Sequence, residues 1–206
     1  IYQVQGKTAE ALECGKKAVT LATIVNDKRR LGKALMLVSQ MHERESNYSE
    51  AIKYGEQASK LLLEAGDSLN AFKIAVIIHS GKYHQGDTLN SIKNLEQTFA
   101  WLENHNAFMA LPGCALSLGA MYYDLKWTDK SIALYEKVLP VTMQSRDRQS
   151  EAELLSFLGR DYFTTGNFKK ALPNLLKAET TCNEIGDKII MPDVYEYLAK
   201  KKKKTG

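Results

Sequence analysis

Cysteine and proline are scarce in this sequence, and no long apolar run interrupts it. It holds three cysteines and four prolines. The cysteines, Cys14, Cys114 and Cys182, lie far apart and form no C-x-x-C pair. We therefore expect small apolar residues, buried or half-buried, in a reducing compartment, and no disulfide framework. No stretch approaches the ~18 apolar residues of a membrane span, and no Gly/Ser or Pro-rich run indicates a linker.

Motifs for catalysis, phosphate binding and metal binding are also missing. The pair Gly81-Lys82 lacks the other residues of a phosphate-binding loop, and there is no H-E-x-x-H or G-x-S-x-G pattern. His79 and His84 fall on different sides of a helix, and with His42 and His105 they form no recognisable ligand set. We expect no catalytic residue, no cofactor, no metal site and no enzymatic activity.

The positive charge of the chain is concentrated at its end. The net charge is +4, and Lys200–Lys204 are five consecutive lysines, so the rest carries 4 − 5 = −1. A nearly neutral body predicts no nucleic-acid binding and no membrane binding by this segment. The lysine run is a polybasic tail, an artificial extension, or the solvated end of a helix. Earlier repeats hold aromatics at these positions, which favours the last two interpretations.

One sequence motif recurs along the whole chain. The segment at 47–67, NYSEAIKYGEQASKLLLEAGD, has counterparts that begin at residues 7, 87, 127 and 167. A small residue recurs every 40 residues, at Ala11, Ala51, Ser91, Ser131 and Ala171. Each repeat contains two stretches with apolar or small residues at spacings of three and four, which predicts two amphipathic helices per repeat.

Turn residues recur with the same period. An Asp returns after a Gly, Asn or Arg, which suits a left-handed helix end followed by an N-cap. These pairs are Asn26-Asp27, Gly66-Asp67, Arg146-Asp147 and Gly186-Asp187. A turn within each repeat is expected at Gly6, Ser46, Gly86, Lys126 and Gly166. At Asn106-Ala107 the cap is missing.

The 40-residue period divides the chain into consecutive repeats, which form a single array. We predict four full repeats between two partial ones, namely 1–27, 28–67, 68–107, 108–147, 148–187 and 188–206. Neither end shows a polar capping helix, which the open end of a solenoid normally needs. We therefore expect a fragment of a longer protein that has additional domains.

The residues at these recurring positions resemble those of the tetratricopeptide (TPR) repeat. The matching features are Gly119 with Tyr122, Gly159 with Tyr162, and the segment GNFKKAL at 166–172. The usual TPR unit has about 34 residues, so this sequence resembles the longer-helix variant of signalling scaffolds and bacterial regulators. The resemblance implies an all-α fold, a right-handed α-solenoid of antiparallel helix pairs. The first helix of each TPR repeat has one position that usually holds a small residue. Here that position holds Ser39, His79, Gly119, Gly159 and Ala199. The large His79 suggests a locally opened repeat.

The resemblance also implies where a partner binds. In the family, the first helices line a concave groove. The corresponding residues here are Lys33, Met36, Gln40, Glu43, Lys73, Val76, Tyr83, Leu116, Tyr123, Arg160 and Phe163. The strongest signal is the column Tyr83, Tyr123 and Phe163, since aromatics are enriched at binding hot spots. The alternative is that these rings only pack on adjacent helices.

Two functions follow from this sequence. The first is a cytoplasmic protein-interaction module that holds a protein or peptide partner in an apolar-aromatic groove, with Arg160, Glu43 and Lys73 as charged selectors. The alternative is a ligand- or peptide-sensing regulatory segment of a larger bacterial signalling protein, such as a transcription regulator or sensor kinase. A cochaperone role is disfavoured, because the groove lacks most of a Lys/Asn carboxylate clamp.

Overall fold

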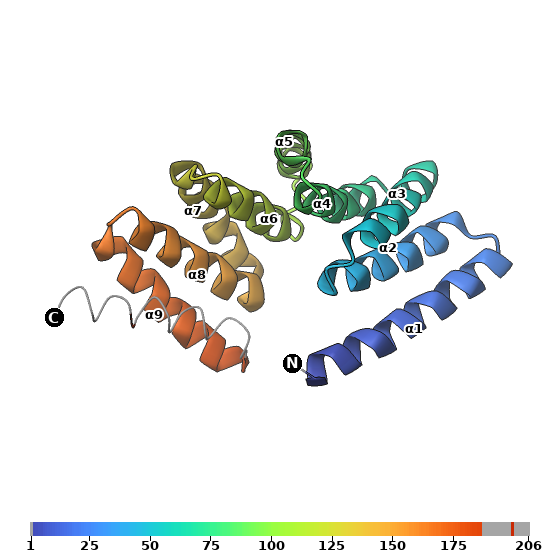
Figure 1. Ribbon diagram of the computed structural model, residues 1–206, viewed down its shortest axis with the longest axis horizontal. Helices are drawn as coiled ribbons and strands as arrows, with labels where there is room; N and C mark the ends of the chain where they lie inside the picture. The colour runs from blue at the N-terminus through green and yellow to red at the C-terminus, as the bar shows by residue number, and fades with distance from the viewer. Residues whose placement is uncertain (1, 187–198, 200–206) are drawn as a thin grey trace. The chain divides into compact units, whose positions relative to one another are not determined.

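Every element that the structure describes is an α-helix. The structure is a computed structural model that describes residues 2–186 and residue 199. The helices in this part of the chain are α1 (Tyr2–Ile24), α2 (Lys28–Arg44), α3 (Tyr48–Glu64), α4 (Ser68–His84), α5 (Thr88–Asn104), α6 (Leu111–Asp124), α7 (Thr128–Ser145), α8 (Arg148–Thr164) and α9 (Phe168–Ile185) (Figure 1). The predicted all-α class is confirmed. The final partial repeat, apart from residue 199, and its lysine run lie outside the described residues.

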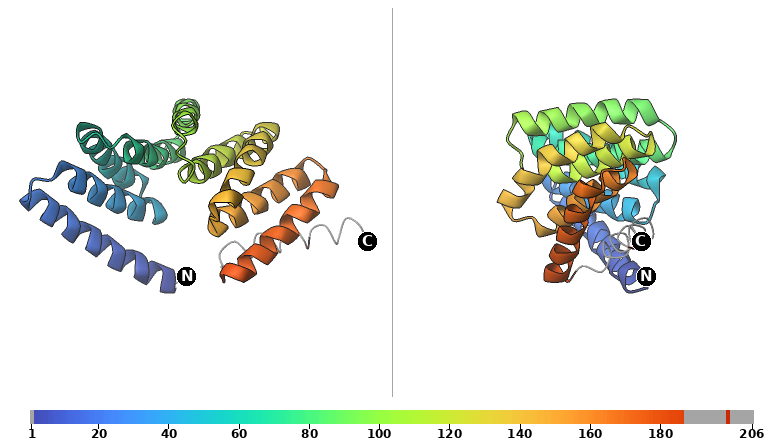
Figure 2. Two further views of the ribbon diagram at one scale, coloured as in Figure 1. Left: turned by 180° about the vertical axis from the view of Figure 1, so that it is seen from behind. Right: turned by 90° about the vertical axis from the view of Figure 1, so that its left-hand side faces the viewer.

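The helices form two compact units, which we describe separately. The first lies within residues 1–105 and contains α1–α5, and the second lies within residues 106–206 and contains α6–α9. In each unit, consecutive helices are antiparallel neighbours joined by short turns (Figures 1 and 2). In addition, α2 contacts α4, and α6 contacts α8. Contact with both the next helix and the next but one is the packing of an all-α helical-repeat solenoid.

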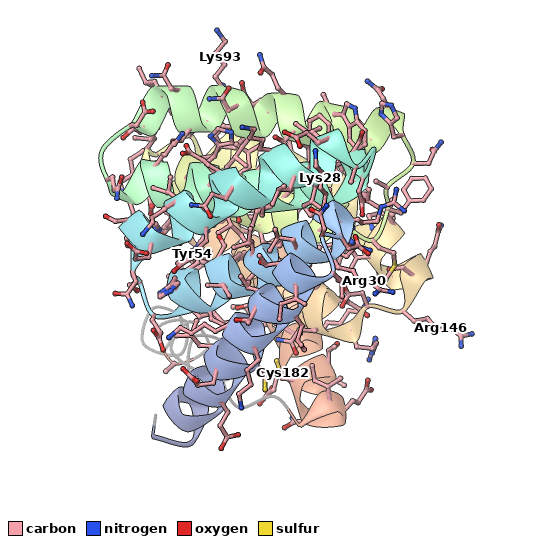
Figure 3. All side chains as sticks on the ribbon, turned by 90° about the vertical axis from the view of Figure 1, so that its right-hand side faces the viewer. Lys28, Arg30, Tyr54, Lys93, Arg146 and Cys182 are labelled. Atoms are coloured by element: carbon pink, nitrogen blue, oxygen red, sulfur yellow. The ribbon has the colours of Figure 1, made fainter. Side chains whose placement is uncertain are left out.

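The aspartates begin the helices as their spacing predicts. Asp27, Asp67 and Asp147 accept hydrogen bonds from the backbone N–H three residues later, at 3.0, 3.3 and 3.1 Å. Each thereby satisfies one of the free N–H groups at a helix start. The residues before them are left-handed, at Asn26 (φ 51°), Gly66 (φ 70°) and Arg146 (φ 58°). Figure 3 shows the Arg146 side chain pointing outward from this turn. Asp187 lies outside the described residues.

The missing cap at Ala107 has a structural consequence. Asn106 is still left-handed (φ 52°), but residues 108–110 form a turn and α6 begins only at Leu111. Pro112 lies in the first turn of α6, where its missing N–H costs nothing. Phe108 and Met109 remain exposed. This helix is therefore shorter than α2, α4 and α8, which begin at an aspartate cap.

The turn predicted at Gly6 is not formed. Helix α1 runs continuously from Tyr2 to Ile24, through Gly6. The other internal turns follow a complete helix on which the next one can fold back. Only five residues precede Gly6, and so short a segment does not repay the cost of nucleating a separate helix.

Small residues allow close helix contacts in the second unit. A Cβ atom added at Gly119 of α6 would lie 2.3 Å from the Tyr135 ring of α7, and one added at Gly159 of α8 would lie 2.5 Å from Leu175 of α9. Tyr135 and Leu175 are themselves fully buried. The predicted small column therefore marks real contacts between paired helices.

The cysteines divide into two classes. Cys114 and Cys182 are buried, and burial raises the pKa of the Cys114 thiol to about 12; Cys182 lies on α9 (Figure 3). Cys14 is exposed, contrary to the prediction, because neighbouring Gly15 rather than Cys14 faces α2. No helix among the described residues has the length and apolar character needed to cross a bilayer. The same part of the chain contains no cluster of His, Cys, Asp and Glu that could hold a metal ion.

Candidate partner-binding surface

Packing against α3 leaves one stripe of α2 partly open. Gly32 and Ser39 face α3: a Cβ at Gly32 would lie 2.8 Å from Leu62, and the Ser39 hydroxyl donates to the Ala51 carbonyl at 2.6 Å. The predicted groove residues of α2 occupy neighbouring positions. Lys33 is exposed, whereas Met36, Gln40 and Glu43 are half-buried.

Helix α4 carries the equivalent stripe. Lys73, Val76 and Tyr83 are half-buried, whereas Ser80 between them is buried. Because α2 contacts α4, the two rows of side chains are neighbours in the first unit. We call them together the α2–α4 stripe, which comprises Lys33, Met36, Gln40, Glu43, Lys73, Val76 and Tyr83.

The charged groups of the α2–α4 stripe are weakly paired. Lys33 lies 3.6 Å from the Asp67 carboxylate. The side chains of Glu43 and Lys73 make no hydrogen bond or ion pair within the part of the chain that the structure describes. Burial raises the pKa of the Glu43 carboxyl, and Arg44 and His84 oppose that shift.

A second opening borders this stripe. A pocket of about 470 Å³ lies between α1 and α2, and Lys33 belongs to its lining. Leu21 of α1 and Val25, which follows α1, line it and are exposed, and Arg30 of α2 also lines it. Figure 3 shows Arg30 beside the end of α1. This pocket was not predicted from the sequence, although apolar residues at 18, 21 and 25 recur at helical spacing.

The second unit has its own set of predicted groove residues. Leu116 and Tyr123 on α6, and Arg160 and Phe163 on α8, are all half-buried, and α6 contacts α8. We call these four residues the α6–α8 stripe. Ser156, in the same column as Leu116, is buried.

Arg160 is not an open charge. Its guanidinium carbon lies 3.7 Å from the Tyr123 ring centroid and 4.7 Å from that of Phe157. Its Nε donates to the carboxylate of Asp161 at 2.7 Å, and the hydroxyl of Ser131 donates to the same buried carboxylate. Only 14% of the Arg160 side chain is exposed. This revises its expected role as a charged selector: Arg160 balances a buried acid and supports Tyr123.

Neighbouring aromatic residues on α6 and α8 differ in burial. Tyr122 and Tyr162 are 6% and 5% exposed, whereas Tyr123 and Phe163, one position later, are half-buried. Phe163 also contacts the Phe168 ring edge-on, with centroids 5.2 Å apart. The half-buried rings therefore combine packing with an accessible edge.

His79 makes the stability of the first unit sensitive to pH. Burial and nearby Lys82 lower its pKa from 6.5, while Asp87 and Glu56 oppose the shift. The buried Nδ1 atom of His79 has no hydrogen-bond partner among the described residues. Since the folded state disfavours the proton, its contribution to stability is complete above pH 6.5 and is lost as the pH falls.

We therefore expect the free energy of unfolding to fall between pH 7.5 and 5.5 by less in His79→Gln than in the original chain. Urea titrations at several pH values measure this slope. His84→Gln, which removes an exposed imidazole, is the control. Equal slopes for the His79→Gln variant and the original chain would contradict the assignment.

Comparison with known proteins agrees with this geometry. The tetratricopeptide-repeat family model matches residues 112–184. No curated protein sequence matches the chain.

Three solved structures share the fold at low sequence identity. A Rap protein complexed with Competence and Sporulation Factor superposes with a TM-score of 0.82 and 13% identity, covering 92% of this chain and 53% of the Rap chain. Aspartyl phosphate phosphatase F from Bacillus subtilis gives 0.79 and 12%, covering 93% and 52%. BtubC from P. vanneervenii gives 0.70 and 16%, covering 89% and 76%.

The chain spans about half the length of the first two of these proteins. At such low sequence identities, the similarity to these structures shows only a shared fold. The match to the family model, in contrast, is a match of sequence. Residues 112–184 therefore match the tetratricopeptide-repeat family model, and the described helices share the helix-pair fold of these solved structures.

Proposed function

We propose that this chain is a protein-interaction module that binds peptide or protein segments on the α2–α4 stripe of its first unit and on the α6–α8 stripe of its second unit. One observation carries the proposal. On α2 and α4, Met36 and Val76 keep partly open apolar surface after packing, beside the accessible groups of Glu43, Lys73 and Tyr83. Apolar and aromatic area with a few polar groups is the usual composition of a binding hot spot.

The structural comparisons support binding as the function. The Rap protein with the same fold was solved with Competence and Sporulation Factor bound. Helical-repeat folds of this kind present extended binding surfaces. The activity in the name of the phosphatase is not transferred at 12% identity, so the proposal concerns binding alone.

A regulatory segment of a larger bacterial protein is the second candidate. It is favoured by one observation, which is that the chain spans only about half of the Rap and phosphatase chains. In this case the stripes sense a ligand or peptide, and a further domain delivers the response. The sequence of the parent gene beyond both ends distinguishes the candidates, since a DNA-binding or kinase domain there would favour the second.

Peptide selection tests the binding proposal. Clones selected on the purified chain from a random peptide library are titrated against Met36→Asp and Val76→Asp, which place a charge on the apolar centre of the stripe. We expect each variant to weaken binding about tenfold or more, because a hot-spot contact is lost and a carboxylate is desolvated.

The matched control is Leu63→Asp, which adds the same charge at an exposed apolar residue of α3 in the same unit. It should leave the affinity unchanged. The proposal is wrong for the first unit if Leu63→Asp weakens the selected peptides as much as Val76→Asp does.

A further inference from the structure

The charges of the α2–α4 stripe follow one direction along both helices. Lys33 and Lys73 lie near the N-terminal ends of α2 and α4, whereas Glu43 lies in the last turn of α2. The apolar residues Met36 and Val76 lie between these ends. Since α2 and α4 are both antiparallel to α3, their ends correspond. The stripe is thus basic at one end, apolar in the middle and acidic at the other.

Glu43 and Lys73 contrast with the other charges of this unit. Lys28 is exposed and Lys82 is half-buried, and they contact Glu64 and Glu56 at 2.8 and 2.7 Å. Neither Glu43 nor Lys73, although half-buried, has such a contact with the described residues. The desolvation of these two groups is therefore not offset by an ion pair within the unit.

The position of Glu43 adds to its attraction for a cation. A carboxylate in the last turn lies beside the negative end of the helix dipole, which is an unfavourable place for it. The nearby charged or titratable groups are Arg44 on the same helix and His84 on α4. His84 is exposed and stacks on Tyr48, with centroids 4.4 Å apart, so its ring is already in contact with α3. A partner cation beside Glu43 would offset both the burial and the dipole.

We propose that the α2–α4 stripe selects a short extended segment with a basic side chain at one end, an acidic side chain at the other and apolar side chains between. This inference rests on the proposed function and names the partner class for the first unit. The basic group pairs with Glu43, the apolar groups cover Met36 and Val76, and the acidic group pairs with Lys73.

The dimensions agree with a segment of about five residues. Lys33 occupies on α2 the position that Lys73 occupies on α4, and it lies ten residues before Glu43, which at 1.5 Å per residue is about 15 Å. Five extended residues span about 13 Å between their first and last Cα atoms. Their terminal side chains cover the remaining distance.

Two capped peptides test the charge assignment by calorimetric titration. The mixed peptide is acetyl-Glu-Leu-Ser-Leu-Arg-amide, and the acidic peptide replaces its Arg by Glu. We expect the original chain to bind the mixed peptide about tenfold more tightly, and Glu43→Lys to reverse this preference. Glu43→Gln should abolish the preference without reversing it, which keeps the test valid if the lysine variant folds poorly.

The control is Glu45→Lys, which makes the same change of net charge at an exposed residue outside the stripe. It should keep the original preference. The assignment is overturned if the original chain does not distinguish the peptides, if it binds neither at about 1 mM, or if Glu43→Lys keeps the preference. Loss of selected peptides in Val76→Asp would still support the proposed function, so the two failures are distinguishable.

Discussion

Gly119→Ala should lower the melting temperature, whereas Gly113→Ala on the same helix should raise it. A Cβ at Gly119 would lie 2.3 Å from the ring of Tyr135, which is fully buried and cannot swing into solvent. Overpacking of this kind costs about 1–3 kcal/mol. Gly113 is exposed and has no atom within 4 Å of an added Cβ, so alanine there gains about 0.5–1 kcal/mol of helix propensity.

The leucine variant at the next repeat should have a larger effect. Gly159→Leu places a branched side chain where even a Cβ would lie 2.5 Å from Leu175. We expect a loss of about 3 kcal/mol or more, at the upper end for overpacked cores. Thermal and urea denaturation of the three variants measure these changes. Unchanged stability of Gly119→Ala and Gly159→Leu would contradict the packing of α6 on α7 and of α8 on α9.

Truncation of the two adjacent tyrosines of α6 should destabilise the fold to very different extents. Tyr122→Ala and Tyr162→Ala should each cost about 3–5 kcal/mol, because both rings are buried between helices. Tyr123→Ala should cost about 1 kcal/mol or less, mainly the contact with Arg160, and Phe163→Ala should behave similarly. Tyr123→Ala and Phe163→Ala should instead weaken the binding of a partner to the second unit about tenfold or more.

Calorimetry on the four variants requires no knowledge of the partner. If Tyr123→Ala and Phe163→Ala melt as early as Tyr122→Ala and Tyr162→Ala, the second column is part of the core. The α6–α8 stripe would then not be a binding surface. The alternative weighed from the sequence, that these rings only pack on adjacent helices, would be correct.

Helix starts could be predicted because their signals are local. Asp27, Asp67 and Asp147 cap helices at the predicted positions, since an N-cap contacts a residue only three positions away. The late start of α6 was only partly predictable. The absent cap at Ala107 was recognised, but the shift to Leu111 also depends on Pro112 in the first helical turn.

The roles of individual charges could not be predicted from the repeat. Arg160 occupies a groove column by register, yet its charge is balanced by buried Asp161 and its side chain lies against Tyr123 and Phe157. That arrangement depends on side chains from two helices, which a single column does not reveal. The exposure of Cys14 was missed for a related reason, because periodicity identifies an apolar face but not what covers it.

Methyl NMR of methionine tests most directly whether a partner binds the α2–α4 stripe. Met36 lies half-buried in the stripe, while Met109 and Met143 are exposed outside both stripes. With 13C-methyl methionine, a peptide selected on the chain should shift the Met36 signal and leave those of Met109 and Met143 unchanged. A shift at Met109 or Met143 with no change at Met36 would contradict the proposed binding surface.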